Sequence, residues 1–388
     1  MSKQYNRFID YFNRSDKILW LISLATSIYC LIILASVSRT GSNVFFIQLI
    51  AIVAGYIGAV LLTSVDYHVI ASMWKFIAIF CVGIIAYSLI FGIAVEGSAG
   101  INAKAWIKLP GGITFQPSEL VKIGFIVTFA RHLSAVKEKD KFKSFFRIIG
   151  LAVHALVPIV LTHLQGDDGA AIIFFCMFVI MSFAAGVPLK YFAIMSCVLI
   201  LLVPVAWNYL LADYQKQRLI NQFNPESDPL NMGYQQIQGK ISIGSGQIFG
   251  KGLFNGNMVG QGIVPIQESD FIISAVGEEL GFVGCILVIS LLFAIIMRTL
   301  IISANSCDTL GSYICVGFLS LIMSQTIFNL GMCLSILPVM GVTLPFFSAG
   351  GSSAACLYLG FGLVQNVYIN RFSTKDFRVK FENKKKTN

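Results

Sequence analysis

Long apolar segments recur along the chain of 388 residues, separated by shorter polar connections. Each is about 20 residues long, which lets a helix cross the ~30 Å hydrocarbon core of a bilayer. The pattern therefore predicts an all-α polytopic membrane protein with about ten transmembrane helices, rather than a soluble protein with a large core. The predicted spans are residues 18–37, 44–64, 70–95, 117–135, 146–163, 170–189, 191–211, 271–303, 311–335 and 348–370.

The longest less apolar stretch, residues 212–270, separates the seventh predicted span from the eighth. Loops of this length are usually functional or disordered. This one contains aromatic residues, glycines and few charges, so we expect it to fold against the membrane helices. No period of 20–50 residues repeats, and residues 1–388 are interpreted as one integral membrane domain.

Basic residues gather at three places in a chain that is 56% hydrophobic, 12% charged and carries a formal net charge of +9. They lie in residues 1–17, 131–147 and 371–388. With ten spans all three fall on one face, which the positive-inside rule makes the cytoplasmic face of a bacterial cell membrane. Both termini are then cytoplasmic, and the loop 212–270 is extracytoplasmic. The positive charge indicates topology and contact with anionic membrane lipids, and no nucleic-acid partner is predicted.

The usual patterns for metal and nucleotide sites are missing from the sequence. The nine cysteines are scattered without a CxxC pair, and the four histidines form no HExxH motif. The segment GSGQIFGKG (244–252) has Ser245 where a phosphate-binding loop needs glycine, and Gly252 where it needs serine or threonine. We interpret this segment as tight turns at the bilayer surface.

The unusual polar segments all lie on the predicted outer face. AWIKLPGGITFQPSELVK (105–122) leads into the fourth span, LQGDDG (164–169) joins the fifth and sixth, and LPVMGVTLPFFSAGGSS (337–353) joins the ninth and tenth. The predicted cytoplasmic connections offer basic residues, short turns and termini. Polar chemistry is therefore expected at the outer surface of the cytoplasmic membrane, beside the loop 212–270.

Four carboxylates, Glu268, Asp270, Glu278 and Glu279, crowd the start of the eighth span in VPIQESDFIISAVGEELGFVG (264–284). Asp270 lies where the loop meets the membrane, within reach of water and of a lipid head group, so it is the candidate general base. If the helix starts at Asp270, Glu278 lies roughly 12 Å further along it. This exceeds the ~6.5–9.5 Å separation of a direct acid and base pair in inverting glycosidases. Glu278 and Glu279 are therefore expected to be structural, since charges below the membrane surface need partners.

An acid and a base share one side of the predicted fourth span, because Glu119 and Lys122 are three residues apart in its first turn. Two interpretations remain open for them. Either the pair is structural and neutralises two charges near lipid, or Lys122 tunes a nearby acid or meets an anionic substrate. Trp106, flanked by Lys104 and Lys108, is interpreted as an interfacial anchor.

Several long segments together resemble one family, the SEDS proteins (shape, elongation, division and sporulation). The resemblance covers nearly the whole chain, in the family's order. NPESDP and NLGM…LPVMG favour the rod-shape (RodA) branch over the division (FtsW) branch. The segments that carry the resemblance are WIKLPGGITFQPSELVKI, QGDDGAA, residues 214–252 from YQKQRLINQFNPESDP onward, SDFIISAVGEELGFVGC and NLGMCLSILPVMGVTLPFFSAGGSS.

The resemblance implies a peptidoglycan glycosyltransferase that polymerises lipid II, an undecaprenyl-linked disaccharide-peptide, outside the cytoplasmic membrane. It also implies a class B penicillin-binding protein, a transpeptidase, as the partner. The family's essential acid, in its T-D-F motif, falls on Asp270. The substrate-binding or supporting residues that the resemblance implies are Trp106, Gln116, Glu119, Lys122, Asp167 and Arg218, with Glu268 as a neighbouring acid.

In such an enzyme Asp270 would take the proton of the attacking 4-hydroxyl, and Arg218 and Lys122 are candidate partners of the departing diphosphate or of a carboxylate. Direct displacement with one base inverts the anomeric centre. A divalent cation, Mg²⁺ or Mn²⁺, could share the diphosphate charge. No carboxylate cluster in the sequence marks a metal site, so no metal ligand is assigned.

Some positions differ from the family pattern. The usual L-P-E-x-H-T-D is VPIQESD here, so a carboxylate is missing at Ile266 and one appears at Glu268. Q-P-D-L-G-T-A has become QGDDGAA, Ala349 replaces the tyrosine of S-Y-G-G-S-S, and Ala105 replaces the arginine before Trp106. These differences bear on the detailed contacts with the substrate head group.

Three alternatives to an elongation polymerase stay open at this point. The first is an FtsW- or SpoVE-type polymerase for division or sporulation. The second is a non-catalytic scaffold for the cell-wall partner, which the departures from the family pattern favour. The third is a flippase or transporter of lipid-linked precursor, for which internal repeats and midplane charges serving both faces would be expected.

Overall fold

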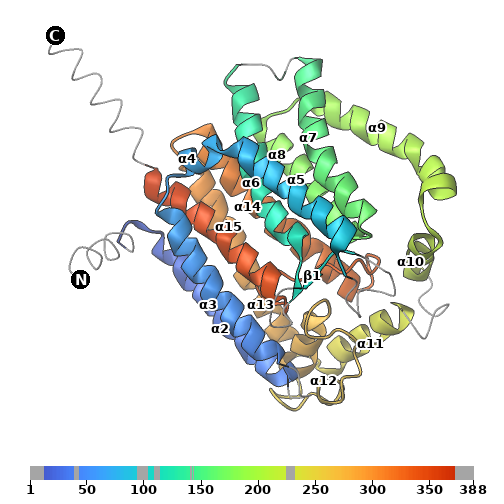
Figure 1. The fold of residues 1–388 in the computed structure, drawn as a ribbon. Helices are drawn as coiled ribbons and strands as arrows, with labels where there is room; N and C mark the ends of the chain where they lie inside the picture. Colours follow the sequence, from blue (N-terminus) through green and yellow to red (C-terminus); the bar gives the residue numbers. More distant parts are fainter. Residues whose placement is uncertain are drawn as a thin grey trace, which may run out of the picture.

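The computed structural model describes residues 13–38, 43–93, 104–108, 114–139, 142, 144–223 and 232–371. Within these ranges the longest helices run alternately between the two ends of one bundle (Figure 1), which confirms the predicted all-α polytopic fold. The ten longest are α2 (Lys17–Val37), α3 (Val44–Thr63), α5 (Trp74–Phe91), α6 (Pro117–Lys137), α7 (Phe145–Leu164), α8 (Asp168–Ala185), α9 (Leu189–Val205), α13 (Ile272–Ala304), α14 (Thr309–Cys333) and α15 (Gly351–Asn370).

Eight of these helices are long and apolar enough to cross a membrane, and α6 and α15 are the two that are more polar. Both lie among other helices, α6 between α5, α14 and α15, and α15 between α3, α14 and α6. In α6, 15 of 21 residues are buried, and in α15, 14 of 20. A helix surrounded by protein can carry polar side chains that a lipid-facing helix cannot. Among the ten long helices, the two more polar ones are thus the ones that other helices surround.

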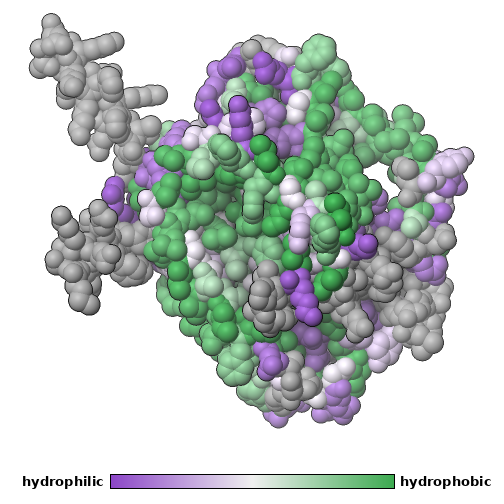
Figure 2. All heavy atoms as spheres, viewed as in Figure 1, coloured by the Kyte–Doolittle hydropathy of each residue, from purple (hydrophilic) through white to green (hydrophobic). Residues whose placement is uncertain are grey.

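Apolar side chains cover the outside of the bundle in a belt between two more polar ends (Figure 2). Leu21, Ile50 and Phe76 are among the large apolar side chains that stand exposed on the bundle surface. In water such a surface would be unfavourable, since each exposed Å² of apolar area costs about 25 cal/mol. The belt is the surface that bilayer lipid covers in a multi-pass membrane protein.

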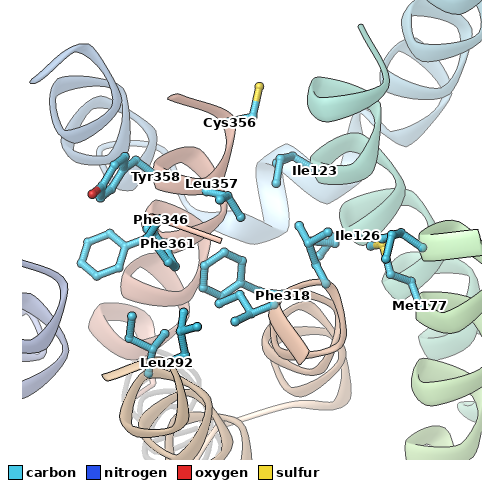
Figure 3. Packing of buried hydrophobic residues seen from close by; sticks show 14 of the residues in the cluster. Ile123, Ile126, Met177, Leu292, Phe318, Phe346, Cys356, Leu357, Tyr358 and Phe361 are labelled. Atoms are coloured by element: carbon cyan, nitrogen blue, oxygen red, sulfur yellow. The ribbon is translucent and has the colours of Figure 1, made fainter. Parts of the chain in front are cut away.

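The core of the bundle depends on close contacts between α3, α14 and α15 (Figure 3). A Cβ atom at Gly360 of α15 would lie 2.6 Å from the ring of Phe318 on α14, and one at Gly362 would lie 2.7 Å from the Cα atom of Ala59 on α3. Without side chains at these two positions the helices approach closely, which is a usual way to pack helices inside a membrane. Ile123 of α6 also approaches this glycine, since its Cδ1 atom would lie 3.1 Å from a Cβ atom at Gly360.

The described parts of the loop 212–270 fold against the membrane helices, as the sequence predicted. They form α10 (Asp213–Phe223), α11 (Met232–Ser245) and α12 (Asn257–Gln261). Helix α11 packs on α13, where Ser242 Oγ donates a hydrogen bond to the Ser274 carbonyl (3.0 Å). The three helices lie at the end of the bundle where α6, α8, α13 and α15 begin (Figure 1). We call this end the site face.

Before the large loop, the structure differs from the predicted elements in three places. The predicted span 70–95 is divided at Met73 into a short helix α4 (Tyr67–Ser72) and α5. Helix α9 ends in a π-helical turn, η2 (Ala206–Leu210). An antiparallel pair of short strands, β1 (Ile107–Lys108) and β2 (Thr114–Phe115), precedes α6, with Ile107 opposite Phe115. Two residues per strand are too few to produce a recognisable pattern in a sequence.

At the face opposite the site, ionic contacts join α4 to the connection between α13 and α14. On α4, His68 lies between two carboxylates, with its Nδ1 2.8 Å from Asp66 and its Nε2 2.7 Å from Asp308. Asp308 also accepts a hydrogen bond from the Tyr67 hydroxyl (2.9 Å). The hydrogen bond to Asp308 raises the pKa of His68 to about 9, and Asp66 adds to the effect. His68 therefore carries a positive charge that joins α4 to the connection between α13 and α14.

We predict that His68→Gln lowers thermal stability in a pH-dependent way. Because the folded-state pKa lies above the ordinary value of 6.5, the ionic contribution is complete below about pH 6.5 and is lost as the pH rises through about 9. The thermal midpoint of the variant in detergent should lie a few degrees below that of the parent at pH 6, and close to it at pH 10. An equal difference at both pH values would show that His68 acts by packing alone.

Candidate active site

Asp270 lies in an irregular turn immediately before α13, and α14 holds that turn by its backbone. The Nδ2 of Asn329 donates one hydrogen bond to the Asp270 carbonyl (2.8 Å) and another to the Val342 carbonyl (2.8 Å). The Cys333 thiol also donates to the Asp270 carbonyl (3.4 Å). The fully buried amide of Asn329 thus joins the turn at Asp270 to the segment that follows α14.

The connection between α14 and α15 fixes the two residues before Asp270. Ser348 Oγ donates to the Ser269 carbonyl (2.6 Å) and accepts from the Leu344 amide (2.7 Å). The Ala349 amide donates to the Glu268 carbonyl (2.8 Å). Because all these bonds are made to the backbone of residues 268–270, the position of Asp270 does not require particular side chains there.

Electrostatics make Asp270 a suitable base. Burial raises its pKa to about 6, and the negative charges of Glu268 and Asp167 raise it as well, while the Ser269 hydroxyl acts in the opposite direction. Its carboxylate stands next to Gly341, where a Cβ atom would lie 3.7 Å from Oδ2. A carboxylate with this pKa is mostly ionised at neutral pH and accepts a proton more readily than an ordinary aspartate.

Asp167 stands at the start of α8, and its two oxygens have different partners. Oδ1 accepts from the Ala170 amide (2.9 Å) and so caps the helix. Oδ2 accepts from Gln116 Nε2 (2.7 Å) and from Ser118 Oγ (3.2 Å), both at the start of α6. Three of the residues predicted for the site, Gln116, Asp167 and Asp270, are therefore brought to one region at the site face.

Glu119 and Lys122 form an ion pair of 2.8 Å one turn further into α6. The side chains are 7% and 3% exposed, so the pair is closed off from solvent. Of the two interpretations that the sequence left open, this geometry supports the structural one. Lys122 lies too deep to meet a substrate at the surface while it stays paired.

Glu278 and Glu279 belong to a separate cluster in α13. The Glu278 carboxylate pairs with Lys251 (2.7 Å) and accepts from the amides of Met258 (3.1 Å) and Val259 (2.9 Å). Glu279 Oε1 accepts from Ser36 Oγ (2.6 Å) on α2. These contacts supply the partners that buried charges require, and they anchor α12 to α13, in support of the predicted structural role.

Two further predicted residues lie at the edges of the site. Trp106 is half-buried beside β1, and its carbonyl accepts from the Ile93 amide (2.8 Å). Arg218 lies on α10, and its side chain is outside the described residues. Sequence reasoning missed Asn329 and Ser348. A buried asparagine in an otherwise apolar span is the signal that could have found the first of them.

An apolar cavity of about 370 Å³ adjoins the site between α7, α8 and α10. Met340 lines it, one residue before the Gly341 that contacts Asp270. Over the described part of the chain, histidines, cysteines and acids form no group of three that could hold a metal ion. The described residues therefore offer no such ligand set, and no catalytic step is assigned to a metal ion.

Comparison with known proteins gives the family. Residues 16–373 match a family model for FtsW, RodA and SpoVE, described as a cell cycle protein. The peptidoglycan glycosyltransferase MrdB of Escherichia coli K12 is 31% identical over 357 residues, which cover 92% of this chain and 94% of MrdB. The probable peptidoglycan glycosyltransferase FtsW of Geobacter sp. M18 is 31% identical over 322 residues, covering 81% of this chain and 83% of FtsW.

Solved structures agree with this match. A chain from a peptidoglycan synthase complex, studied for its coordination of polymerization and crosslinking, superposes with a TM-score of 0.78 at 26% identity. The rod shape determining protein RodA of Thermus thermophilus superposes with a TM-score of 0.69 at 24% identity. Each comparison covers 92% of this chain and 98% of the other.

Fold and site together define a polytopic membrane protein with an acid held at one end of its helix bundle, where α14 and the connection after it fix its position. The family match and the curated relatives make the assignment specific. The chain belongs to the FtsW, RodA and SpoVE family, and it is RodA-like within it.

We predict that Lys122→Met destabilises the protein by about 3–5 kcal/mol, because it leaves the buried Glu119 carboxylate without its partner. The loss should appear as a lower thermal midpoint in detergent. The double variant Glu119→Gln with Lys122→Met removes both charges and should recover much of the loss. A single variant as stable as the parent would mean that the pair contributes nothing to folding.

Proposed function

We propose that this chain is a peptidoglycan glycosyltransferase that polymerises lipid II into glycan strands, with release of polyprenyl diphosphate, during cell elongation. The observation that carries the proposal is Asp270, an acid with a pKa of about 6 at the junction of loop and membrane. It stands in a chain whose curated relatives are peptidoglycan glycosyltransferases. Its position suits a substrate whose sugar lies in water and whose tail lies in lipid.

Lipid II carries its own leaving group, so the protein must supply alignment, a base and positive charge. Asp270 takes the proton of the acceptor's 4-hydroxyl as that oxygen bonds to the anomeric carbon. The bond from this carbon to the diphosphate breaks, and its electron pair leaves with the phosphate oxygen. The displacement inverts the anomeric centre. A well-placed base typically contributes about 10²–10⁴-fold to such a reaction.

The neighbours of Asp270 have distinct roles in this mechanism. Asp167, held by Gln116 (2.7 Å), keeps a negative charge near Asp270 and so raises its affinity for a proton. The negative charge of Glu268 also raises the affinity of Asp270 for a proton. For the leaving diphosphate we propose Arg218, because a guanidinium binds phosphate oxygens in pairs. Lys122 supports the site through Glu119 rather than by meeting the substrate.

The partner and the orientation follow from the same proposal. We infer a class B penicillin-binding protein as the partner, supported by the similarity to a chain from a complex that combines polymerization with crosslinking. The site face is then extracytoplasmic in a bacterial cell membrane, and both termini are cytoplasmic. A requirement for Mg²⁺ or Mn²⁺, which could share the diphosphate charge from the substrate's side, is tested by chelation during the polymerisation assay.

Asp270→Asn should abolish polymerisation and leave the fold intact, since asparagine keeps the size of the side chain but cannot take a proton. The measurement is glycan-chain formation by the purified protein with its partner on lipid II in detergent or vesicles. The variant should retain the thermal midpoint of the parent. A folded variant that polymerises at near the parent rate would contradict the assignment of the base.

Glu268→Gln is the matched control, because it changes a neighbouring carboxylate in the same way. It should retain part of the activity. In the parent, kcat/KM should rise with pH through about 6, where Asp270 ionises. Removing the charge of Glu268 should move this rise in kcat/KM to lower pH, because that charge raises the pKa of Asp270.

The orientation predicts the labelling of single cysteines in intact cells. In a variant without the nine native cysteines, Lys240→Cys on α11 should react with a membrane-impermeant thiol reagent. Lys139→Cys, just beyond the end of α6 at the opposite face, should react only after the cells are lysed. The reverse result would place Asp270 in the cytoplasm and would exclude polymerisation outside the membrane.

A further inference from the structure

Two consecutive aspartates at the start of α8 have partners on different helices. Asp167 contacts Gln116 and Ser118 of α6, on the side of the site. Asp168 contacts His163 at the end of α7 through Oδ1 (2.7 Å) and Gln215 of α10 through Oδ2 (2.7 Å). The second aspartate therefore ties α10, which belongs to the large loop, to two helices of the bundle.

The chemistry of these groups fixes the direction of each hydrogen bond. An ionised carboxylate can only accept, so His163 carries its proton on Nδ1 and Gln215 presents its NH₂ group to Asp168. The amide group of Gln215 cannot rotate by 180° without losing a hydrogen bond, because its Oε1 accepts from the Ala212 amide (3.0 Å). Gln215 is 8% exposed. One side chain thus caps the start of α10 and tethers it to α8.

A second glutamine holds the other end of α10. Gln222 Nε2 donates to the Ser335 carbonyl (2.7 Å), and Gln222 Oε1 accepts from Gln236 Nε2 (3.0 Å). Gln215 and Gln222 are seven residues apart, about two helical turns, and so lie on one face of α10. Leu219 lies between them on that face and lines the apolar cavity. Arg218 occupies the adjoining helical position.

Helix α10 forms one wall of the cavity of about 370 Å³, and another wall includes Met340, the residue before the Gly341 that contacts Asp270. Ile172 and Phe175 of α8 line the cavity together with Met340. A Cβ atom at Gly169 would lie 2.4 Å from the Met340 carbonyl, so the start of α8 packs directly on the segment beside Asp270. The placement of α10 therefore determines the shape of an apolar space next to the candidate base.

We propose that Asp168 is a positioning residue that holds α10 in place over the apolar cavity beside Asp270. The family pattern Q-P-D-L-G-T-A has leucine at this position, and leucine could not accept the hydrogen bonds that form the clamp of Asp168, His163 and Gln215. By positioning α10, the clamp fixes one wall of the cavity that binds a lipid-linked substrate. That last point rests on the proposed function, whereas the attachment of α10 does not.

Exchange of donor and acceptor provides the test. Gln215→Glu keeps the acceptor that caps α10 but places a second carboxylate against Asp168, so the clamp should open. Asp168→Asn alone removes the charge of the acceptor and leaves one neutral carbonyl in place of two carboxylate oxygens, so it should weaken the clamp as well. In the double variant, the asparagine NH₂ group donates to the new glutamate and its carbonyl accepts from His163. The double variant should therefore restore the clamp.

Hydrogen–deuterium exchange of the full-length protein measures the clamp directly. In each single variant, protection of the α10 amides (Asp213–Phe223) should fall about tenfold or more, as expected for loss of a hydrogen bond to a charged group. It should return to within about twofold of the parent in the double variant. Protection of α13 and the thermal midpoint should stay at parent values throughout. Glu138→Gln, which changes a carboxylate bonded to Ser134 (3.0 Å) at the opposite face, is the control and should alter nothing in α10.

Polymerisation kinetics on lipid II measure the positioning role. The single variants should lose about tenfold in kcat/KM, mainly through a higher KM because Asp270 is untouched, and the double variant should recover it. Unchanged protection of α10 in both single variants would overturn the clamp. Lower protection with unchanged kinetics would overturn the positioning role. If the parent protein does not polymerise lipid II, the proposed function is refuted. Hydrogen–deuterium exchange of α10 would then still test whether the clamp exists.

Discussion

The buried amide of Asn329 joins two irregular segments that could not otherwise lie inside a membrane protein. Backbone groups buried inside the protein cannot form hydrogen bonds with water, so each needs a partner within the protein. Asn329 supplies one for Asp270 and one for Val342 (2.8 Å each). Ser348 supplies another for Ser269 (2.6 Å). Asp270 stands where these segments meet, and its place depends on bonds that side chains of α14 and its following loop make to the main chain.

The same requirement explains the break in α13. Gly281 has φ 66° and ψ −161°, so the helical bonds around it are lost. The carbonyls of Glu278 and Glu279 instead accept from the amides of Lys251 (3.0 Å) and Gly252 (2.9 Å). Only glycine allows the segment 244–252 to lie this close to α13, because a Cβ atom at Gly246 would lie 1.8 Å from the Gly277 carbonyl oxygen. The glycines of segment 244–252 thus allow contact with α13, in addition to forming turns.

Most of the fold could be predicted from the sequence because the thickness of a bilayer fixes the length of an apolar span. The ten long helices coincide with the apolar segments of the sequence, and the predicted spans include the more polar α6 and α15. The pairing of Glu119 with Lys122 followed from their spacing of three residues, and the structure confirms it at 2.8 Å. In each of these cases the information is local in the chain.

The parts that could not be predicted depend on contacts between distant segments. GEELG lies within a long apolar segment that predicts one continuous helix, and its break at Gly281 becomes favourable only when residues near 250 supply new partners. Asp270 was found from its place at the membrane junction and from a family motif, but Asn329, 59 residues further on, could not be connected with it. An isolated polar residue in an apolar span indicates that a partner exists without indicating which one.

Helix α9 has a consequence for how this protein can change over evolution. It has no buried residue along Leu189–Val205, and it lies at the edge of the bundle (Figure 1). Its side chains therefore face lipid, and almost any apolar sequence of the same length would satisfy them. Its two ends are constrained differently, since Gly186 ends α8 in a left-handed conformation and Gln215 joins the following helix to Asp168. Substitutions should accumulate freely within this span, while the residues that bound it remain under selection.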